Sequence, residues 1–364
     1  MPALTTSDII RHRMHNQQLS ATNLKEPAEV VQWLGAMQAQ EYAMAKWAIG
    51  LRLSNVNDSK VEKAFNDGTI LRTHLLRPTW HFVTPADIRW LLALTAPRVH
   101  AANAYMYRQL ELDTKLFKRC HEILIKTLEG GKHLTRATLQ SALKQKKIAA
   151  NGLRLGYIMM HAELEQLICS GPRPGKQFTY ALLDERVPAV KSISREEALA
   201  KLTHRYFTSR GPATLQDFAY WSGLTMKDAI AGAATLGSTF VREIMEGQKY
   251  IFVPTSSKNK TKLDSTFLMP DYDEYGMSYK NRSALSSFQK LKGPKASIVY
   301  NRMLVIDGRI EGTWQRTLNK NAAEVNVVPF ASLSKTNEQK VAKAIKRFCL
   351  FVSSSSGKKN RKKK

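Results

Sequence analysis

The spacing of apolar positions in the first hundred residues predicts helices followed by a bent strand segment. The helices are expected at residues 5–20, from Val30 to Met37, from Ala43 to Leu51 and from Ser59 to Phe65. The run at 70–83 is expected to form two strands broken at Pro78. Pro85 then lies where it can begin a long apolar helix, which Pro97 is expected to end. This order of elements predicts a winged helix.

The same order of elements recurs twice. Residues 134–184 contain a helix capped at Thr135, a helix from Gly152 through Ile168 and a basic, glycine-rich hairpin from Cys169 to Leu182. Residues 196–254 contain helices at 196–207, 215–222 and 225–236, followed by strands around Phe240 and Ile251. The chain therefore predicts three winged-helix modules in tandem.

From residue 261 onward strand patterns dominate, at 267–270, 298–300, 303–310 and 323–328. Asp307-Gly308 predicts a hairpin turn, and a last helix is expected from Asn337 to Phe348. The chain ends in a basic, serine-rich segment with too little apolar content to fold. The predicted fold is α+β, with an N-terminal winged-helix region at 1–125, a second winged helix at 126–190, a third at 191–260, a β-rich region at 261–350 and a disordered basic tail at 351–364.

Charge points to the class of partner. The 364 residues include 56 basic and 30 acidic ones, a net charge of +26, which favours a polyanion. Nucleic acid is the first candidate and an anionic membrane surface the second. No apolar run approaches the roughly 18 residues of a spanning helix, and the first residues lack a signal pattern, so we expect a cytoplasmic, nucleoid-associated protein. The three cysteines are expected to be reduced thiols, mostly buried.

The segment Gln38-Ala39-Gln40 is the strongest candidate site, because it places two neutral amides between two helical patterns. Residues two apart point to opposite sides of a helix but to the same side of an extended segment. The two glutamines can therefore meet one ligand only if the backbone opens here.

Five runs together resemble a known family: 37–51, 76–82, 160–164 with its hairpin, 211–224, and 273–275 with 279–283. They are similar to the bacterial winged-helix DNA-binding family that contains the AlkZ and YcaQ DNA glycosylases. The resemblance implies removal of alkylated bases from double-stranded DNA without a cofactor. In the AlkZ branch the catalytic motif is glutamine, apolar residue, glutamine, which Gln38-Ala39-Gln40 matches; in the YcaQ branch the second glutamine is an aspartate.

The chemistry of amides restricts the substrate that such a motif can serve. An amide cannot act as a general base near neutral pH, but it can hold a water by hydrogen bonds. That suffices only when the base already leaves readily, as a cationic N7-alkylated purine does. Two alternatives stay open: Gln38 and Gln40 cap or bridge helices through local hydrogen bonds, or the protein is a non-catalytic, regulatory or architectural winged-helix DNA binder.

Other polar residues are weaker candidates. Asp273 and Glu274 could act as acid or base, but an ion pair with nearby Arg282 is the favoured interpretation. His81 could contact a phosphate or a flipped nucleotide, although a histidine between Trp80 and Phe82 is more often packed in a core. No zinc-type spacing and no phosphate-binding loop is present, so no metal or cofactor is expected. Contacts to DNA phosphates are expected from Arg11, Arg13, Arg52, Arg77, Arg136, Arg154, Arg173, Lys176 and the tail, and no obligate protein partner is inferred.

Overall fold

A computed structural model describes residues 4–254, 265–285, 302–318 and 323–353. The strand expected at 298–300 and residues 354–364 of the expected tail lie outside these ranges. The N-terminal region contains α1 (Thr6–Asn16), α2 (Pro27–Leu34), β1 (Met37–Gln38), α3 (Tyr42–Gly50), α4 (Asp58–Asn66), β2 (Leu71–Leu75), β3 (Thr79–Val83) and α5 (Pro85–Gln109). The bent two-strand segment is confirmed: β2 and β3 pair antiparallel, and β1 joins them in the order β1-β3-β2.

The predicted end of the helix at Pro97 is wrong. Helix α5 continues through Pro97 to Gln109. A proline inside a helix lacks one backbone hydrogen bond and costs about 3 kcal/mol. Packing overcomes this cost here, because Leu94, Ala96 and Val99 on both sides of the proline are buried and α5 contacts α10 (Arg195–Arg210) and α8 (Gly152–Leu164).

The second unit follows α5 and has a hydrophobic core of its own. It contains α6 (Thr114–Leu128), β4 (Leu134–Thr135), α7 (Arg136–Gln145), α8, β5 (Ile168–Ser170), β6 (Thr179–Leu182) and the short α9 (Leu183–Arg186), with sheet order β4-β6-β5. By packing, this unit begins before residue 125, because Phe117 and Cys120 of α6 belong to its core. Helix α8 ends at Leu164 rather than Ile168, since Gln166 adopts a positive φ of 60° and Ile168 pairs with Leu182.

The third unit contains three helices and a hairpin: α10, α11 (Leu215–Ser222), α12 (Met226–Ala234), β7 (Val241–Met245) and β8 (Gln248–Phe252). The C-terminal region contains β9 (Thr266–Leu268), α13 (Glu274–Met277), the 3-10 helix η2 (Ser283–Leu285), β10 (Met303–Ile306), β11 (Arg309–Leu318), β12 (Ala323–Pro329) and α14 (Lys335–Ser353). Its sheet has the order β12-β11-β10-β9, and the predicted turn at Asp307-Gly308 is confirmed by positive φ at both residues. Helix α14 extends past the expected boundary at 350, and its Phe351 is buried.

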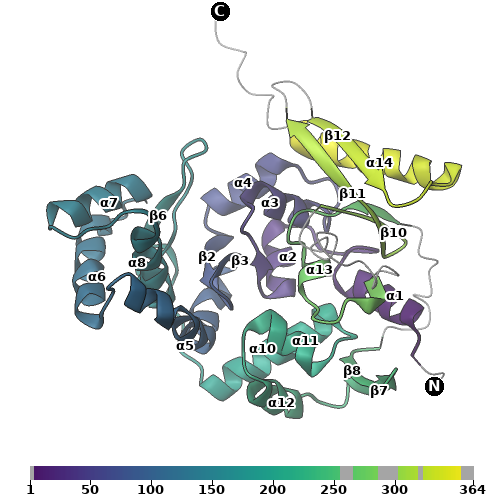
Figure 1. Ribbon diagram of the computed structural model, residues 1–364, viewed down its shortest axis with the longest axis horizontal. Helices are drawn as coiled ribbons and strands as arrows, with labels where there is room; N and C mark the ends of the chain where they lie inside the picture. Colours follow the sequence, from purple (N-terminus) through teal and green to yellow (C-terminus); the bar gives the residue numbers. More distant parts are fainter. Residues whose placement is uncertain (1–3, 255–264, 286–301, 319–322, 354–364) are drawn as a thin grey trace, which may run out of the picture.

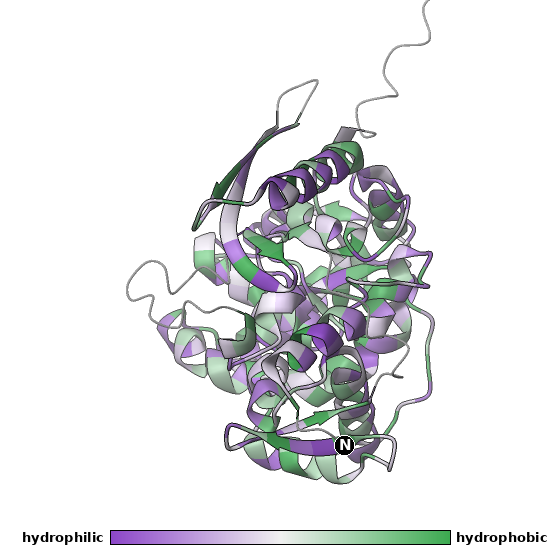
Figure 2. Ribbon diagram, turned by 90° about the vertical axis from the view of Figure 1, so that its right-hand side faces the viewer, coloured by the Kyte–Doolittle hydropathy of each residue, from purple (hydrophilic) through white to green (hydrophobic). Residues whose placement is uncertain are grey.

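Two main cores explain the arrangement in Figure 1. The unit with α6, α7 and α8 stands to one side, follows α5 in the chain and also contacts β2 through α8 and β5. The N-terminal, third and C-terminal regions share one continuous core, to which Leu164 of α8 and Cys169 of β5 also belong. Helix α14 closes that core on one side, with Val341, Ala344, Phe348 and Phe351 inward and hydrophilic residues outward, as the mixed colouring in Figure 2 shows. No helix among the described residues has the length and apolar character needed to cross a membrane.

Candidate active site

The backbone opens at the glutamine pair, as the interpretation required. Met37 and Gln38 form β1, in which Gln38 lies opposite His81 of β3. The pairing continues one residue further, because the amide of Ala39 donates to the carbonyl of Trp80 at 2.7 Å. An extended segment directs alternate side chains to the same side. The Gln38 side chain is nearly buried, with 7% exposure, whereas Gln40 is exposed.

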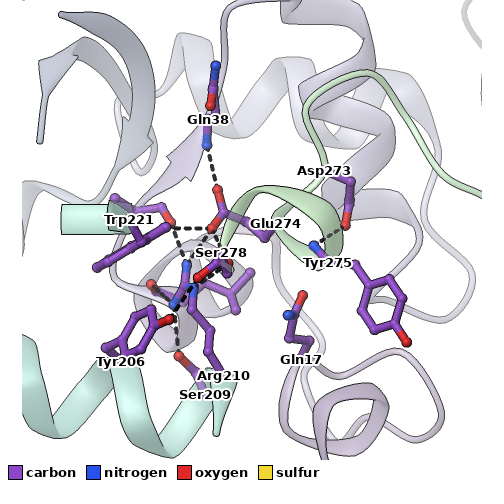
Figure 3. A network of polar contacts seen from close by, with 12 residues as sticks. Gln17, Gln38, Tyr206, Ser209, Arg210, Trp221, Asp273, Glu274, Tyr275 and Ser278 are labelled. Atoms are coloured by element: carbon purple, nitrogen blue, oxygen red, sulfur yellow. Dashed lines mark hydrogen bonds and ion pairs between the residues drawn. The ribbon is translucent and has the colours of Figure 1, made fainter. Parts of the chain in front are cut away.

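Two buried charged groups hold the backbone that leads into this strand. The Arg210 guanidinium of α10 donates to the carbonyls of Leu34 at 2.7 Å and Ala36 at 3.0 Å. Glu274 of α13 accepts the backbone amide of Gln38 through Oε1 at 2.9 Å and pairs with Arg210 through Oε2 at 2.7 Å. In Figure 3 the Gln38 side chain extends away from this network, so the network binds the strand through its backbone and does not involve the side-chain amide.

A third charged group holds the C-terminal part of the segment. Arg72 of β2 donates through Nε to the Ala39 carbonyl at 3.0 Å and through Nη2 to the Gln40 carbonyl at 3.4 Å. Its guanidinium lies over the Trp80 ring, 4.2 Å from the centroid. Burial lowers the pKa of Arg72 to about 10, so this side chain still carries its charge near neutral pH. The backbone from Leu34 to Gln40 is therefore hydrogen-bonded at successive positions by Arg210, Glu274 and Arg72, which are distant in sequence.

Among the predicted residues, Arg77 contacts the Gln38 side chain and His81 lies opposite Gln38 in the β1–β3 pair. Arg77, in the turn between β2 and β3, donates to Gln38 Oε1 at 3.1 Å. Fixing the oxygen in this way orients the Gln38 amide, whose NH2 group can only donate. His81 is fully buried, its Nδ1 lies 2.9 Å from the Thr79 carbonyl, and burial together with Arg77 lowers its pKa to about 3. A neutral, fully buried imidazole of this kind is what a packed core histidine shows, which is the interpretation that the sequence favoured.

Asp273 and Glu274 are both held in buried ion pairs, as the favoured interpretation expected, but not with Arg282. Asp273 pairs with Arg52 at 2.9 Å and Glu274 with Arg210 at 2.7 Å. Arg282 instead donates to the Gly276 carbonyl and the Tyr220 hydroxyl. Burial would raise the pKa of Glu274, but the charge of Arg210 and its hydrogen bonds hold it at about 2. Both carboxylates therefore tie α13 to the N-terminal core.

The comparisons with known proteins agree with the resemblance that the sequence carries. A model of the DNA glycosylase AlkZ-like family matches residues 31–351. The chain belongs to the AlkZ-like family. The interstrand DNA cross-link repair glycosylase of Streptomyces sahachiroi is 24% identical over 368 residues, with 95% of each chain covered. The solved structure of the Streptomyces sahachiroi DNA glycosylase AlkZ has the same fold, with a TM-score of 0.78 at 20% identity, covering 96% of this chain and 98% of that one.

Two of the arginines expected to contact DNA are inside the AlkZ-like fold. Arg52 is fully buried against Asp273 and Gln17. Arg13 has 1% exposure, donates to the Pro212 carbonyl at 2.9 Å and lies 3.5 Å from the centre of the Tyr279 ring. Both side chains are therefore inaccessible to a DNA phosphate in this structure, because elements distant in sequence cover Arg13 in the first helix and Arg52, which follows the glutamine segment.

The other predicted cations are at least partly exposed. Arg11 pairs with Asp8, Arg154 hydrogen-bonds the carbonyl of Leu110, and Arg173 pairs with Glu62. These contacts occupy the three guanidinium groups but leave each side chain partly accessible. Arg77 and Arg136 are half-buried and Lys176 is exposed at the tip of the β5–β6 hairpin.

The structure adds site residues that the sequence did not indicate. Arg72 and Arg210 hold the motif backbone, yet neither belongs to a recognisable local sequence pattern. The pairing of β2 with β3 and the burial of α10 bring these two side chains to the motif. Three surface hollows lie elsewhere and include neither glutamine. Among the described residues, His100, His161 and Glu165 place donor atoms close enough to hold a metal ion, outside this site.

Proposed function

We propose that this chain is a monofunctional DNA glycosylase that hydrolyses the N-glycosidic bond of N7-alkylated purines in duplex DNA, cross-linked purines included. Gln38 and Gln40 hold the attacking water. The observation that carries the proposal is the opened backbone at Gln38-Ala39-Gln40, which Arg72, Arg210 and Glu274 hold through hydrogen bonds to residues 34–40. The family match supports glycosylase activity, and the relative named for interstrand cross-link repair supports bulky substrates.

The reaction that this arrangement favours needs no acid group. The bond between the purine N9 and the sugar C1′ breaks, and its electron pair neutralises the positive charge that N7 alkylation put on the ring. Water oxygen then bonds to C1′, and its proton leaves to solvent. Amide oxygens near the sugar stabilise the oxocarbenium-like centre, and amide hydrogens and oxygens orient the water. A normal purine has no such charge to neutralise, so the proposed substrate class is restricted to cationic adducts.

The hydrogen bonds around Gln38 support a positioning role over a capping role. Its backbone amide is already bonded to Glu274 and its side-chain oxygen to Arg77, so the side chain caps no helix among the described residues. Gln40 is exposed, and its backbone carbonyl accepts from Arg72. Rigid support of this kind is what positional catalysis requires, because a displacement of about 1 Å can cost roughly 100-fold in rate.

We further propose that the repeated helix–helix–hairpin units are winged-helix modules that bind the DNA backbone. The second unit, with three helices, a three-stranded sheet and the exposed Lys176 at its hairpin tip, supports this assignment best. Arg77, Arg136 and the cationic tail supply further charge. Contacts of this type position a protein on a duplex without reading its sequence, which suits a search for damage.

The deciding experiment is single-turnover release of free base from duplex DNA carrying N7-methylguanine. Gln38→Ala and Gln40→Ala are each expected to slow release by about 10- to 1000-fold while duplex binding changes little. The control is Gln32→Ala, which removes an exposed glutamine from α2 and should behave like the parent.

Two outcomes would contradict parts of this proposal. A parent protein that binds duplex DNA but releases no base from methylated or cross-linked substrate would indicate a non-catalytic DNA binder. Release that is equally fast in the parent and in both alanine variants would keep the activity and discard the glutamine site.

A further inference from the structure

A cluster of imidazoles lies where three helices of the second unit and its neighbour meet. His100 comes from α5, His121 from α6 and His161 from α8, and Glu165 directly follows α8. Donor atoms of His100, His161 and Glu165 all lie within 4.8 Å of one another. We propose that these three residues bind a divalent transition-metal ion of the zinc type.

The distance between Glu165 and His100 matches such an ion, and the donor atom of His161 lies within 4.8 Å of both. A tetrahedral zinc centre with bonds of roughly 2.0–2.1 Å places its ligand atoms about 3.3 Å apart. Glu165 Oε1 lies 3.0 Å from His100 Nε2. That buried nitrogen nevertheless has no well-aligned hydrogen-bond partner among the described residues. Such a short but poorly aligned contact is expected when the lone pairs of Glu165 Oε1 and His100 Nε2 both point toward the position of a metal ion. His161 and Glu165 are four residues apart, so their side chains lie on one side of the same helix end.

Neighbouring groups hold the two imidazoles in place. The Tyr107 hydroxyl lies 2.9 Å from His100 Nδ1, which leaves Nε2 of the neutral ring to offer its lone pair. The Phe117 ring stacks on His161 with centroids 3.6 Å apart, and His121 Nε2 lies 3.2 Å from His161 Nδ1. Partners of this kind orient metal-binding histidines in known sites. Two imidazoles and one carboxylate suit zinc, with copper and nickel as competitors.

The place of the site in the fold suggests its effect. The buried residues of α5 belong to the shared main core, whereas α8 contributes Ile158, Met159 and Ala162 to the core of the second unit and Leu164 to the main core. An ion held by His100 on one helix and by His161 and Glu165 on the other would link the two cores. The proposed ion thus stabilises the position of the second unit and takes no part in base release, so its test is independent of the proposed reaction.

The test uses full-length protein without an affinity tag, treated with chelator and then titrated with Co²⁺ and Zn²⁺. Cobalt should give visible d–d absorption bands that saturate near one equivalent, and zinc should displace the cobalt and raise the melting temperature. Glu165→Gln removes the charged ligand from a side chain that is 47% exposed, so the variant should fold. It should weaken zinc binding at least as much as the roughly 10- to 100-fold loss known for changes around metal ligands. His161→Ala should do the same.

Two controls separate this site from other donors. His133→Ala changes an exposed histidine of the same unit outside the cluster and should leave zinc affinity unchanged. Cys349→Ser removes the thiol that is only partly buried and should also have no effect. Zinc affinity that is the same in the parent, in Glu165→Gln and in His161→Ala would overturn the proposal. Binding that disappears only in Cys349→Ser would overturn it as well.

Discussion

Replacing Glu274 by glutamine tests whether the buried network positions β1, the strand that carries the proposed catalytic Gln38. Oε2 of Glu274 accepts from Arg210 at 2.7 Å, from Trp221 Nε1 at 2.9 Å and from Ser278 Oγ at 3.1 Å, while Oε1 accepts the Gln38 amide at 2.9 Å. A glutamine has one acceptor oxygen and one NH2 group that can only donate. Either the Gln38 amide or the three donors on the other side must therefore lose an acceptor.

The free energy of unfolding that Glu274→Gln removes can be calculated in two ways. Removing one partner of a buried ion pair costs about 3–5 kcal/mol, because the remaining charge is left uncompensated. Separately, the pKa of Glu274 falls from an ordinary 4.5 to about 2, which corresponds to about 3 kcal/mol of stabilisation. The folded-state pKa is the lower one. The stabilisation is therefore complete above about pH 4.5 and is lost as the pH falls toward 2.

Asp273→Asn is the matched control. Asp273 forms an equally buried pair with Arg52 on the same short segment but makes no contact with Gln38 among the described residues. Urea unfolding at neutral pH should show a loss of about 3–5 kcal/mol for each variant. Single-turnover base release, measured at a temperature where both variants are folded, should fall about 10- to 100-fold only in Glu274→Gln, since only that variant disturbs β1.

Equal base release in the two folded variants would refute the positioning argument. The Glu274 network would then stabilise the fold without influencing the glutamines. A loss of less than about 1 kcal/mol in Glu274→Gln would refute the energetic part, because so small a cost is typical of exposed ion pairs.

Three further predictions concern pH, salt and the C-terminal charge. The pKa of His81 is lowered to about 3, so the unfolded chain binds a proton that the folded chain does not, and the free energy of unfolding falls as the pH drops from about 6.5 toward 3. His81→Leu should reduce this pH dependence by up to about 1.4 kcal/mol per pH unit in urea unfolding at several pH values. An unchanged pH dependence in the variant would contradict the prediction. Duplex affinity should fall with salt, with a log–log slope of about 0.9 per phosphate contact, and a flat response between roughly 50 and 200 mM would count against phosphate binding. Deleting the cationic residues 358–364 should weaken nonspecific duplex binding and flatten that salt slope in a filter-binding or anisotropy titration, whereas equal slopes would exclude the segment from DNA binding.

Local patterns in the sequence were sufficient to predict most helices and strands and to select the candidate motif. Thr135 caps α7 and Asp307-Gly308 forms the β10–β11 turn, because capping and turn geometry depend on a few neighbouring residues. The spacing of Gln38 and Gln40 implied an opened backbone if the pair acts together, and the structure shows β1 there. The family resemblance is confirmed over residues 31–351.

Only the tertiary structure decided which charges are buried and which partners they have. Asp273 and Glu274 pair with arginines 221 and 64 residues away rather than with nearby Arg282. Helix periodicity shows that a face is basic, but it contains no information about which distant element will cover that face. Long-range packing decides the burial of Arg52, the continuation of α5 through Pro97 and the proximity of His100 and His161. Its free energy exceeds the local conformational preferences of about 1–3 kcal/mol from which secondary structure is predicted.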